Sequence, residues 1–179
     1  MNETPDFTDI SILPRTHNHA DATKDARVRR ELLIFKRAEM LFGVFADETA
    51  GATQGIKLTP LPRAPVAVLG VTSVRGRILT VLDPVALIAE NSGARNADVS
   101  PAPVSVVALR GDEQLALVVD RVEGVVEIVV EEITPSDHST RAVRGVVAHE
   151  ALPVLVLDVQ ELFAATMHGA ERRRRRSNI

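Results

Sequence analysis

Short runs of valine, isoleucine and leucine dominate the chain between residues 31 and 164, and glycine, proline, aspartate and asparagine separate these runs. Branched apolar side chains fit the pleated surface of a β-strand, whereas the separating residues favour turns. The pattern therefore predicts an all-β fold. We expect strands at 31–36, 40–46, 56–59, 66–74, 77–82, 103–110, 114–120, 125–131, 142–148 and 153–157.

The same landmarks occur twice along this region. Segments 70–83 and 145–158 both begin with glycine, end with aspartate and share the spacing of their apolar residues. Further matches lie upstream: Leu58-Thr59-Pro60 with Ile133-Thr134-Pro135, and Phe35 and Leu41 with Leu109 and Leu115. The sequence thus predicts two copies of one unit, at about 31–90 and 103–168, joined by a linker at 91–102. Five or so strands in each copy favour two small barrels, because closing a sheet removes its exposed edges.

Each copy is expected to end in a short helix. Asp83 is a good N-cap residue, and Pro84 suits the first helical position that follows it. In the second copy, Asp158 and Glu161 have the spacing of a capping box, which predicts a helix over about 159–168.

The two ends of the chain have a different composition from the middle. Residues 1–30 are polar, mixed in charge and without apolar periodicity, so we expect a disordered N-terminal arm before the domain at 31–168. Residues 169–179 form a basic disordered tail that contains five consecutive arginines, Arg172, Arg173, Arg174, Arg175 and Arg176. Such a tail can bind polyanions such as nucleic acid or anionic lipid, or it can simply keep the protein soluble.

Composition excludes several classes of function. The chain has no cysteine, which rules out disulfides, thiol catalysis and thiolate metal sites. Aromatic residues make up 3% of the chain, too few for a stacking platform that binds single-stranded nucleic acid. No apolar run approaches the roughly 20 residues of a membrane span, and the N-terminus does not resemble a signal peptide. We therefore expect a soluble, cytoplasmic protein.

No combination of residues indicates catalysis, a cofactor or a metal site. The segment Gly51–Lys57 resembles a phosphate-binding loop only faintly, because its spacing is wrong and no serine or threonine follows the lysine; we interpret it as a flexible turn. His149 and Glu150 lack a nucleophile and an orienting partner. The sequence therefore predicts that the protein is not an enzyme.

Residues 111–132 carry seven acidic side chains and one arginine. Such a surface repels nucleic acid. It suits a basic protein partner, or it serves only solubility.

Three segments of the first copy together resemble the CheW-like domain of bacterial chemotaxis adaptors. They are the run Leu33–Val44, the segment Leu58–Pro65 and the segment Gly70–Asp83, which contains Val71 and the pair Arg75-Gly76. The second copy is similar through Ile133-Thr134-Pro135 and the run Val154–Asp158. The resemblance covers about residues 31–165.

This resemblance implies a fold and a set of partners. Members of the family form two interlocked five-stranded SH3-like β-barrels. They are not enzymes, and they couple the tips of methyl-accepting chemotaxis receptors to a CheA-type histidine kinase. For this chain the resemblance implies an adaptor in a chemotaxis, pilus or gliding-motility array, with other CheW-like domains as further partners.

The resemblance also implies site residues. The family's receptor-binding signature, Asn-x-Arg-Gly, corresponds here to Ser73, Val74, Arg75 and Gly76, with serine in place of asparagine. Phe42 and Val44 are expected to contact the kinase or another partner. The family glutamate that would pair with the loop arginine corresponds to Gly51, so we expect Arg75 to be exposed and without an internal acid.

The alternative function is a small-barrel nucleic-acid binder that uses its arginine-rich tail. Under this hypothesis, binding to polyanions is independent of sequence and weakens with salt. Deleting residues 171–179 is expected to abolish binding to DNA or anionic vesicles and to leave the thermal unfolding midpoint nearly unchanged. Binding that survives the deletion would place the basic site elsewhere in the chain.

Overall fold

The computed structural model describes residues 27–89, 102–136, 141–162 and 164 of the 179-residue chain. Ten β-strands make up most of this part: β1 Arg29–Arg37, β2 Met40–Phe45, β3 Thr49–Ile56, β4 Val68–Val74, β5 Arg77–Leu82, β6 Val104–Leu109, β7 Leu115–Val119, β8 Arg121–Val129, β9 Val143–His149 and β10 Leu152–Leu157. The helices are short: the 3₁₀ turns η1 Ala46–Glu48 and η2 Val130–Glu132, and helix α1 Pro84–Ile88. No helix among these residues is long and apolar enough to cross a membrane.

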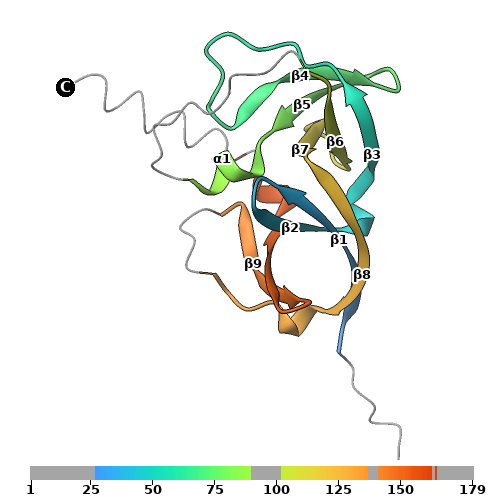
Figure 1. The fold of residues 1–179 in the computed structure, drawn as a ribbon, viewed down its shortest axis with the longest axis vertical. Helices are drawn as coiled ribbons and strands as arrows, with labels where there is room; N and C mark the ends of the chain where they lie inside the picture. Colours follow the sequence, from blue (N-terminus) through green and yellow to red (C-terminus); the bar gives the residue numbers. More distant parts are fainter. Residues whose placement is uncertain (1–26, 90–101, 137–140, 163, 165–179) are drawn as a thin grey trace, which may run out of the picture.

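The strands form two five-stranded sheets that exchange strands between the two sequence copies. One sheet, which we call sheet A, has the order β8-β1-β2-β10-β9, and the other, sheet B, has the order β3-β6-β7-β5-β4. Sheet A therefore joins two strands of the first copy to three of the second, and sheet B does the reverse. The chain crosses between the sheets after β2 and again after β7, and the two barrels lie one above the other in Figure 1.

A short bridge closes each sheet into a barrel. In sheet B, Thr59 lies after edge strand β3 and exchanges two backbone hydrogen bonds with Val71 of β4, at 2.8 and 2.9 Å. In sheet A, Thr134 makes the equivalent pair of bonds with Val146 of β9. The predicted two interlocked barrels are confirmed. The exchange also means that neither copy makes a barrel from its own strands alone.

Three apolar clusters explain why several strands are buried on both faces. One cluster, with Leu32, Ile34 and Phe45, fills the inside of sheet A, and another, with Leu79 and Val81, fills the inside of sheet B. The third and largest combines residues of both sheets with both C-terminal helical turns: Phe35, Phe42, Val44, Leu82, Leu87, Leu109, Leu117, Leu157 and Leu162 are among its members. Alternate residues along a strand point to opposite faces. Strands such as β7, buried at every position, thus serve a barrel interior and the junction between the barrels at once.

The predicted duplication extends to the backbone. Gly70 and Gly145 occupy the same place in β4 and β9, next to the bridges that close the barrels. A Cβ at either position would lie 2.4 Å from a backbone oxygen, that of Thr59 or Thr134 respectively. Only glycine allows the two strands to approach so closely.

The predicted helix caps are also confirmed. The Asp83 carboxylate accepts a hydrogen bond from the amide of Val85 at 3.0 Å, and helix α1 follows. The Asp158 carboxylate accepts from the amides of Gln160 and Glu161 at 3.1 and 3.3 Å, and residues 159–162 are helical. The remainder of the predicted helix at 163–168 falls mostly outside the described residues, as do the linker, most of the N-terminal arm and the whole basic tail.

Two sequence-based expectations for the first copy are wrong. The segment Gly51–Lys57 is not a flexible turn, because most of it belongs to β3, which pairs with β6. Both glycines have positive φ, 118° at Gly51 and 72° at Gly55, and the strand register shifts beside each of them. Glycines that mark bulges in an edge strand were thus interpreted as turn residues. The strand expected at 56–59 is replaced by the bridge at Thr59. In addition, β1 begins at Arg29, inside the predicted arm.

Replacing Gly145 with alanine is expected to lower the free energy of unfolding by about 2–3 kcal/mol, since the new methyl group overlaps a backbone carbonyl that cannot move without breaking the barrel closure. The control is Gly55→Ala, where the Cβ meets nothing within 4 Å and only the φ of 72° is unfavourable for alanine, so a loss of about 1 kcal/mol is expected. Urea unfolding of both variants measures the difference. An equal loss in the two variants would contradict the closure geometry.

Candidate functional site

The hairpin between β4 and β5 is built around a two-residue turn, Arg75-Gly76. Both residues have positive φ, 50° and 77°, which is the conformation of a type I′ turn and matches the twist of the flanking strands. Glycine adopts it freely, whereas arginine does so at a cost of roughly 1 kcal/mol. The turn thus presents Arg75 at the tip of the hairpin in a backbone conformation that its residue type does not favour.

The Arg75 side chain is exposed, as the sequence analysis expected. Within the described part of the chain it forms no ion pair and no side-chain hydrogen bond. The same holds for Arg77, two residues further on, which is also exposed. Ile78 pairs with Ser73, on the face of the hairpin opposite to Val74, and leaves 66% of its surface open to solvent. The hairpin tip therefore carries two available guanidinium groups and an exposed apolar side chain.

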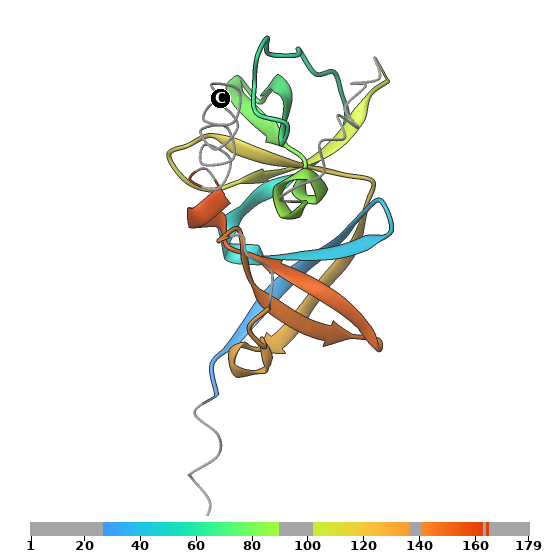
Figure 2. The ribbon, with the colours of Figure 1, turned by 90° about the vertical axis from the view of Figure 1, so that its left-hand side faces the viewer.

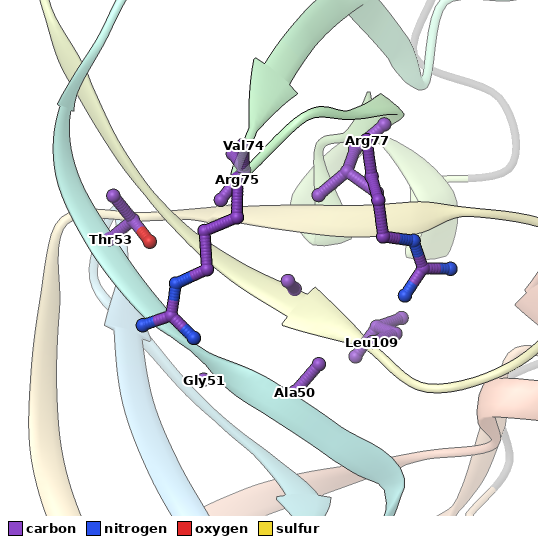
Figure 3. A pocket seen from close by; sticks show the side chains of 9 residues that line it. Ala50, Gly51, Thr53, Val74, Arg75, Arg77 and Leu109 are labelled. Atoms are coloured by element: carbon purple, nitrogen blue, oxygen red, sulfur yellow. The ribbon is translucent and has the colours of Figure 1, made fainter.

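A pocket of about 150 Å³ lies between this hairpin and strand β3. Arg75 and Arg77 border it, and its remaining lining is small or apolar: Ala50, Gly51, Thr53, Val74, Leu79, Ala108 and Leu109. Figure 3 shows Arg75 reaching from the turn toward β3, where its guanidinium group ends near Gly51, while Arg77 extends toward the side of Leu109. We call this hollow the Arg75 pocket. None of its lining residues is acidic.

Two of the four predicted receptor-binding residues, Val74 and Arg75, line the Arg75 pocket. Gly76 completes the turn. Ser73 pairs with Ile78 across the hairpin and faces solvent outside the pocket.

The opposite wall of the pocket consists of residues that the sequence did not predict as part of a site. Ala50, Gly51 and Thr53 come from β3, and Ala108 and Leu109 come from β6 of the other sequence copy. The sequence does not show that β3 is a strand that pairs with β6, and this pairing forms the wall of the pocket. Arg77 could have been found, since it follows the turn directly.

The expectation that Phe42 and Val44 contact the kinase or another partner is corrected by the structure. Both side chains are 0% exposed and belong to the cluster at the junction of the barrels. The Phe42 ring stacks on Phe35, with ring centroids 5.8 Å apart. Strand β2 is buried on both faces from Phe42 to Phe45, and the sequence pattern does not distinguish such a strand from one with an exposed apolar face. In this conformation a partner cannot touch either residue.

Other candidate features of the sequence provide no second chemical centre. His149 and Glu150 lie at the turn of the β9–β10 hairpin, where Glu150 and Ala151 have φ of 49° and 64°, so this turn is the counterpart of Arg75-Gly76. Across the described ranges no group of three histidine, cysteine, aspartate or glutamate residues could hold a metal ion. The arginines at 172–176 lie outside these ranges, and their binding to polyanions stays a prediction.

Within the acidic segment 111–132, Asp120 pairs with Arg37, Glu123 with Arg121 and Glu127 with Arg29. Arg37, at the end of β1, donates to Asp120 at 2.8 Å and to Asp83 at 2.8 and 3.3 Å. The hydrogen bond to Asp83 is the main reason that the pKa of Arg37 lies above its ordinary value. The Asp120 carboxylate also accepts a hydrogen bond from the amide of Ala38 at 2.6 Å. Asp120 joins β7 to β8, so Arg37 fixes the second crossover between the barrels to the cap of helix α1.

A second ionic cluster fixes the first crossover. Arg30 donates to Asp47 of η1 at 2.6 Å, and its guanidinium carbon lies 3.5 Å from the centre of the Phe45 ring. Arg144 of β9 also lies near this ring, at 5.2 Å, and donates to Asp158 at 3.2 Å. A cation near an aromatic face is attracted by the ring quadrupole. The described members of the cluster include no nucleophile, so we interpret it as a clamp that holds the first crossover against sheet A.

Glu48 is the one poorly satisfied member of this cluster. Its carboxylate lies 3.5 Å from Arg30 and 4.0 Å from Arg144, yet its Oε2 is buried without a hydrogen-bond partner in the described structure. Burial raises the pKa of Glu48, and the two arginines only partly oppose this effect. The charged form is therefore less favourable in the folded protein than in the unfolded chain.

Comparison with known proteins gives a consistent result. The model of the CheW-like domain family matches residues 31–167. The probable chemotaxis protein CheW of Rhizobium etli is 27% identical over 142 residues, which cover 76% of this chain and 89% of the relative. Protein FrzA of Myxococcus xanthus is 31% identical over 110 residues, covering 62% of this chain and 66% of the relative. The crystal structure of the scaffolding protein TtCheW from Thermoanaerobacter tengcongensis has a TM-score of 0.61 at 20% identity, with 76% of this chain and 93% of that chain covered, and shares the fold.

Replacing Glu48 with glutamine tests the clamp. Because the folded protein disfavours the Glu48 carboxylate, the variant is expected to be at least as stable as the unmodified protein at pH 7. Because the pKa of Glu48 is raised, this carboxylate binds a proton at a higher pH in the folded protein than in the unfolded chain. The advantage of glutamine should therefore shrink as the pH falls through the folded-state pKa. Urea unfolding at pH 7 and pH 4 measures this. A variant that is clearly less stable at pH 7 would show that the attraction of the arginines outweighs burial.

Proposed function

The chain belongs to the CheW-like domain family, and on that basis we propose that it is a non-enzymatic cytoplasmic adaptor that couples chemoreceptor tips to a CheA-type histidine kinase. The similarity to proteins named as chemotaxis proteins, and to a scaffolding protein, supports this role. The array that it serves controls chemotaxis or another form of motility. The adaptor acts by holding partners in place, with no chemical step of its own.

The availability of Arg75 is the observation that carries the receptor half of the proposal. A guanidinium group presents a planar fork of donors that suits carboxylates and carbonyl oxygens. Arginines that only stabilise a fold have such partners within their own chain, as Arg37 has in Asp83 and Asp120. Arg75 has none within the described residues, and it is held at the exposed tip of a hairpin. This arrangement supports contact with a partner.

The duplicated hairpin provides a surface for a second partner. An adaptor must hold two partners at once, and the β9–β10 turn is the counterpart of the Arg75 turn on the other barrel. This turn carries an acidic residue, Glu150, at the position that corresponds to Arg75. Leu152, which follows the turn, leaves 55% of its surface exposed. We assign the kinase contact to this second hairpin, in place of the buried Phe42 and Val44.

Replacing Arg75 with alanine tests the proposal. The variant is expected to lose about 2 kcal/mol or more of binding energy toward the receptor tip, as interface anchors do. The free energy of unfolding is expected to change by less than about 0.5 kcal/mol, as for a surface residue. Isothermal calorimetry with a purified receptor hairpin measures the first value, and the denaturant midpoint of the same variant measures the second.

Arg63→Ala is the matched control, because Arg63 is also an exposed arginine with positive φ, 60°, but does not line the Arg75 pocket. It should bind like the unmodified protein. If Arg75→Ala kept its affinity and lost stability, Arg75 would be structural. If affinity and stability were both unchanged, the receptor would bind another surface.

A further inference from the structure

The ribbon formed by β1 and β8 has an exposed apolar surface. Leu33 pairs with Val125, and Phe35 pairs with Val122. Residues directly opposite each other share one face of a sheet, as do alternate residues of a strand, so these four side chains lie on the same face. Phe35 is buried beneath this face, whereas Val125 and Val122 leave 51% and 37% of their surface open to solvent. We call the surface formed by Leu33, Val122 and Val125 the β8 patch; the two strands lie side by side in Figure 1.

An apolar surface on this strand is a feature of the second sequence copy alone. Strand β8 is at the edge of sheet A, and no other described strand exposes two large apolar side chains. At the positions of the first copy that correspond to Val122 and Val125, the chain has Asp47 and Ala50. The duplicated fold therefore does not require the two valines. Apolar side chains on an edge strand favour association with another segment, and proteins commonly cover such edges.

The chain itself contains a segment suited to cover the β8 patch. Residues 1–26 precede the described part of the chain and are mostly polar, but they include the apolar cluster Ile10, Ile12 and Leu13. In an extended chain Ile10 and Ile12 point to the same side. A polar arm of this kind becomes ordered only where it finds a surface to bind.

The apolar cluster of the arm can reach the β8 patch. The arm joins the fold at Val28, whose carbonyl oxygen accepts a hydrogen bond from the amide of Val130 at 2.8 Å. Leu33 lies about 17 Å from Val28 along β1, at about 3.4 Å per residue. The residues between Leu13 and Val28 span about 45 Å when extended, so they cover this distance with length to spare. A short tether of this kind gives the segment an effective concentration on the order of 1 mM at the patch.

The β8 patch lies between two pairs of like charges. Glu31 is opposite Glu127 on the side where the arm joins the fold, whereas Lys36 is opposite Arg121 at the other end of the ribbon. The ion pairs that Glu127, Lys36 and Arg121 form with other side chains of the domain are exposed to solvent. Exposed ion pairs contribute little to stability, so these groups can exchange one partner for another at small cost.

The arm carries charges in the complementary order. Asp6 and Asp9 precede its apolar cluster, and Arg15 follows it. An arm that folds back from the start of β1 runs antiparallel to this strand. Arg15 then lies beside the pair of glutamates, and the two aspartates lie beside Lys36 and Arg121. The opposite direction would place acids beside acids, so charge selects one direction of binding.

We propose that the segment Asp6–Arg15 binds the β8 patch of its own chain, with Ile10, Ile12 and Leu13 packed on the exposed valines. The contact is autoinhibitory, because it covers a face of the folded protein and any partner that binds this face must displace the arm. The occupant is part of the same molecule, so the extent of covering does not depend on protein concentration.

The reactivity of a thiol in the patch tests the proposal in the full chain. The chain has no cysteine, so Val125→Cys places a single thiol in the β8 patch. Its rate of reaction with N-ethylmaleimide, which is uncharged, is compared with the rate in a chain that also carries Ile10→Ser and Ile12→Ser. The native arm is expected to slow the reaction about fivefold, as a contact does whose dissociation constant is roughly a quarter of the effective concentration.

The control thiol is Leu61→Cys, at an exposed apolar residue that follows the Thr59 bridge of the other barrel. Its rate should be the same with the native and the substituted arm. Both thiols replace surface residues, so the variants should keep the circular dichroism spectrum of the unmodified protein.

Reversing one charge of the arm tests the direction of binding. Arg15→Glu places an acid beside Glu31 and Glu127 and should raise the reaction rate at position 125 about twofold, as the loss of an exposed ion pair would. Lys24→Glu is the matched control, because it makes the same change of charge in the arm outside the binding segment. It should leave the rate nearly unchanged.

Each result decides between the occupants. Protection at position 125 that persists on dilution and is lost with the serine substitutions supports the arm. Equal rates with the native and the substituted arm would overturn the proposal. Protection that disappears on dilution would assign the patch to a second copy of the chain and would also overturn it. Equal effects of Arg15→Glu and Lys24→Glu would contradict the charge match on which the direction of the arm depends.

Discussion

The exchange of strands between the two sequence copies is the constraint on which the rest of the structure depends. Strands β1 and β2 complete a sheet whose other members come from the second copy, and β6 and β7 do the same for the first. As a result, β2 lies parallel to β10 and β7 lies parallel to β5, although the other pairings are antiparallel. Each crossing segment carries a charged residue held by arginines of other elements: Glu48 and Asp47 at the first, and Asp120 at the second. The largest apolar cluster lies where the two barrels meet, so its burial stabilises the same strand exchange that the crossovers produce.

The candidate site follows from this exchange. The hairpin with Arg75 belongs to the first copy, whereas Ala108 and Leu109, which line the far side of the pocket, belong to the second. Strand β3 lies between them because the first crossover brings it beside β6 (Figure 2 shows the two barrels from the side). A barrel made from one copy alone would not contain this pocket. The duplication supplies two similar hairpins, and the residues at their tips give them opposite charge.

The sequence predicted the fold more completely than the site. The repeated Gly70 and Gly145 and the caps at Asp83 and Asp158 are local features, and the structure confirms each of them. The strand pattern is confirmed except at 51–59. Which strands pair depends on contacts between distant segments, and period-two patterns do not specify it. Gly51 illustrates the difference: in the sequence it reads as part of a turn, and only its pairing partner on β6 reveals an edge strand with a bulge. The predicted partner contact of Phe42 and Val44 was wrong for the same reason. Whether an apolar strand residue is exposed depends on what packs on each face of the strand, and the sequence does not show this.

The most direct test of the account is to separate the two copies. A chain cut within residues 90–101 gives two fragments that each contain one copy, and circular dichroism and proton–nitrogen NMR spectra report whether each fragment folds. The exchange predicts that neither fragment gives a dispersed spectrum alone, because each lacks the strands that complete its sheets. On mixing, the two should combine one to one and reproduce the spectrum of the intact chain. Two fragments that fold independently, each with the spectrum of a closed barrel, would contradict the interlocked fold and the position of the Arg75 pocket that depends on it.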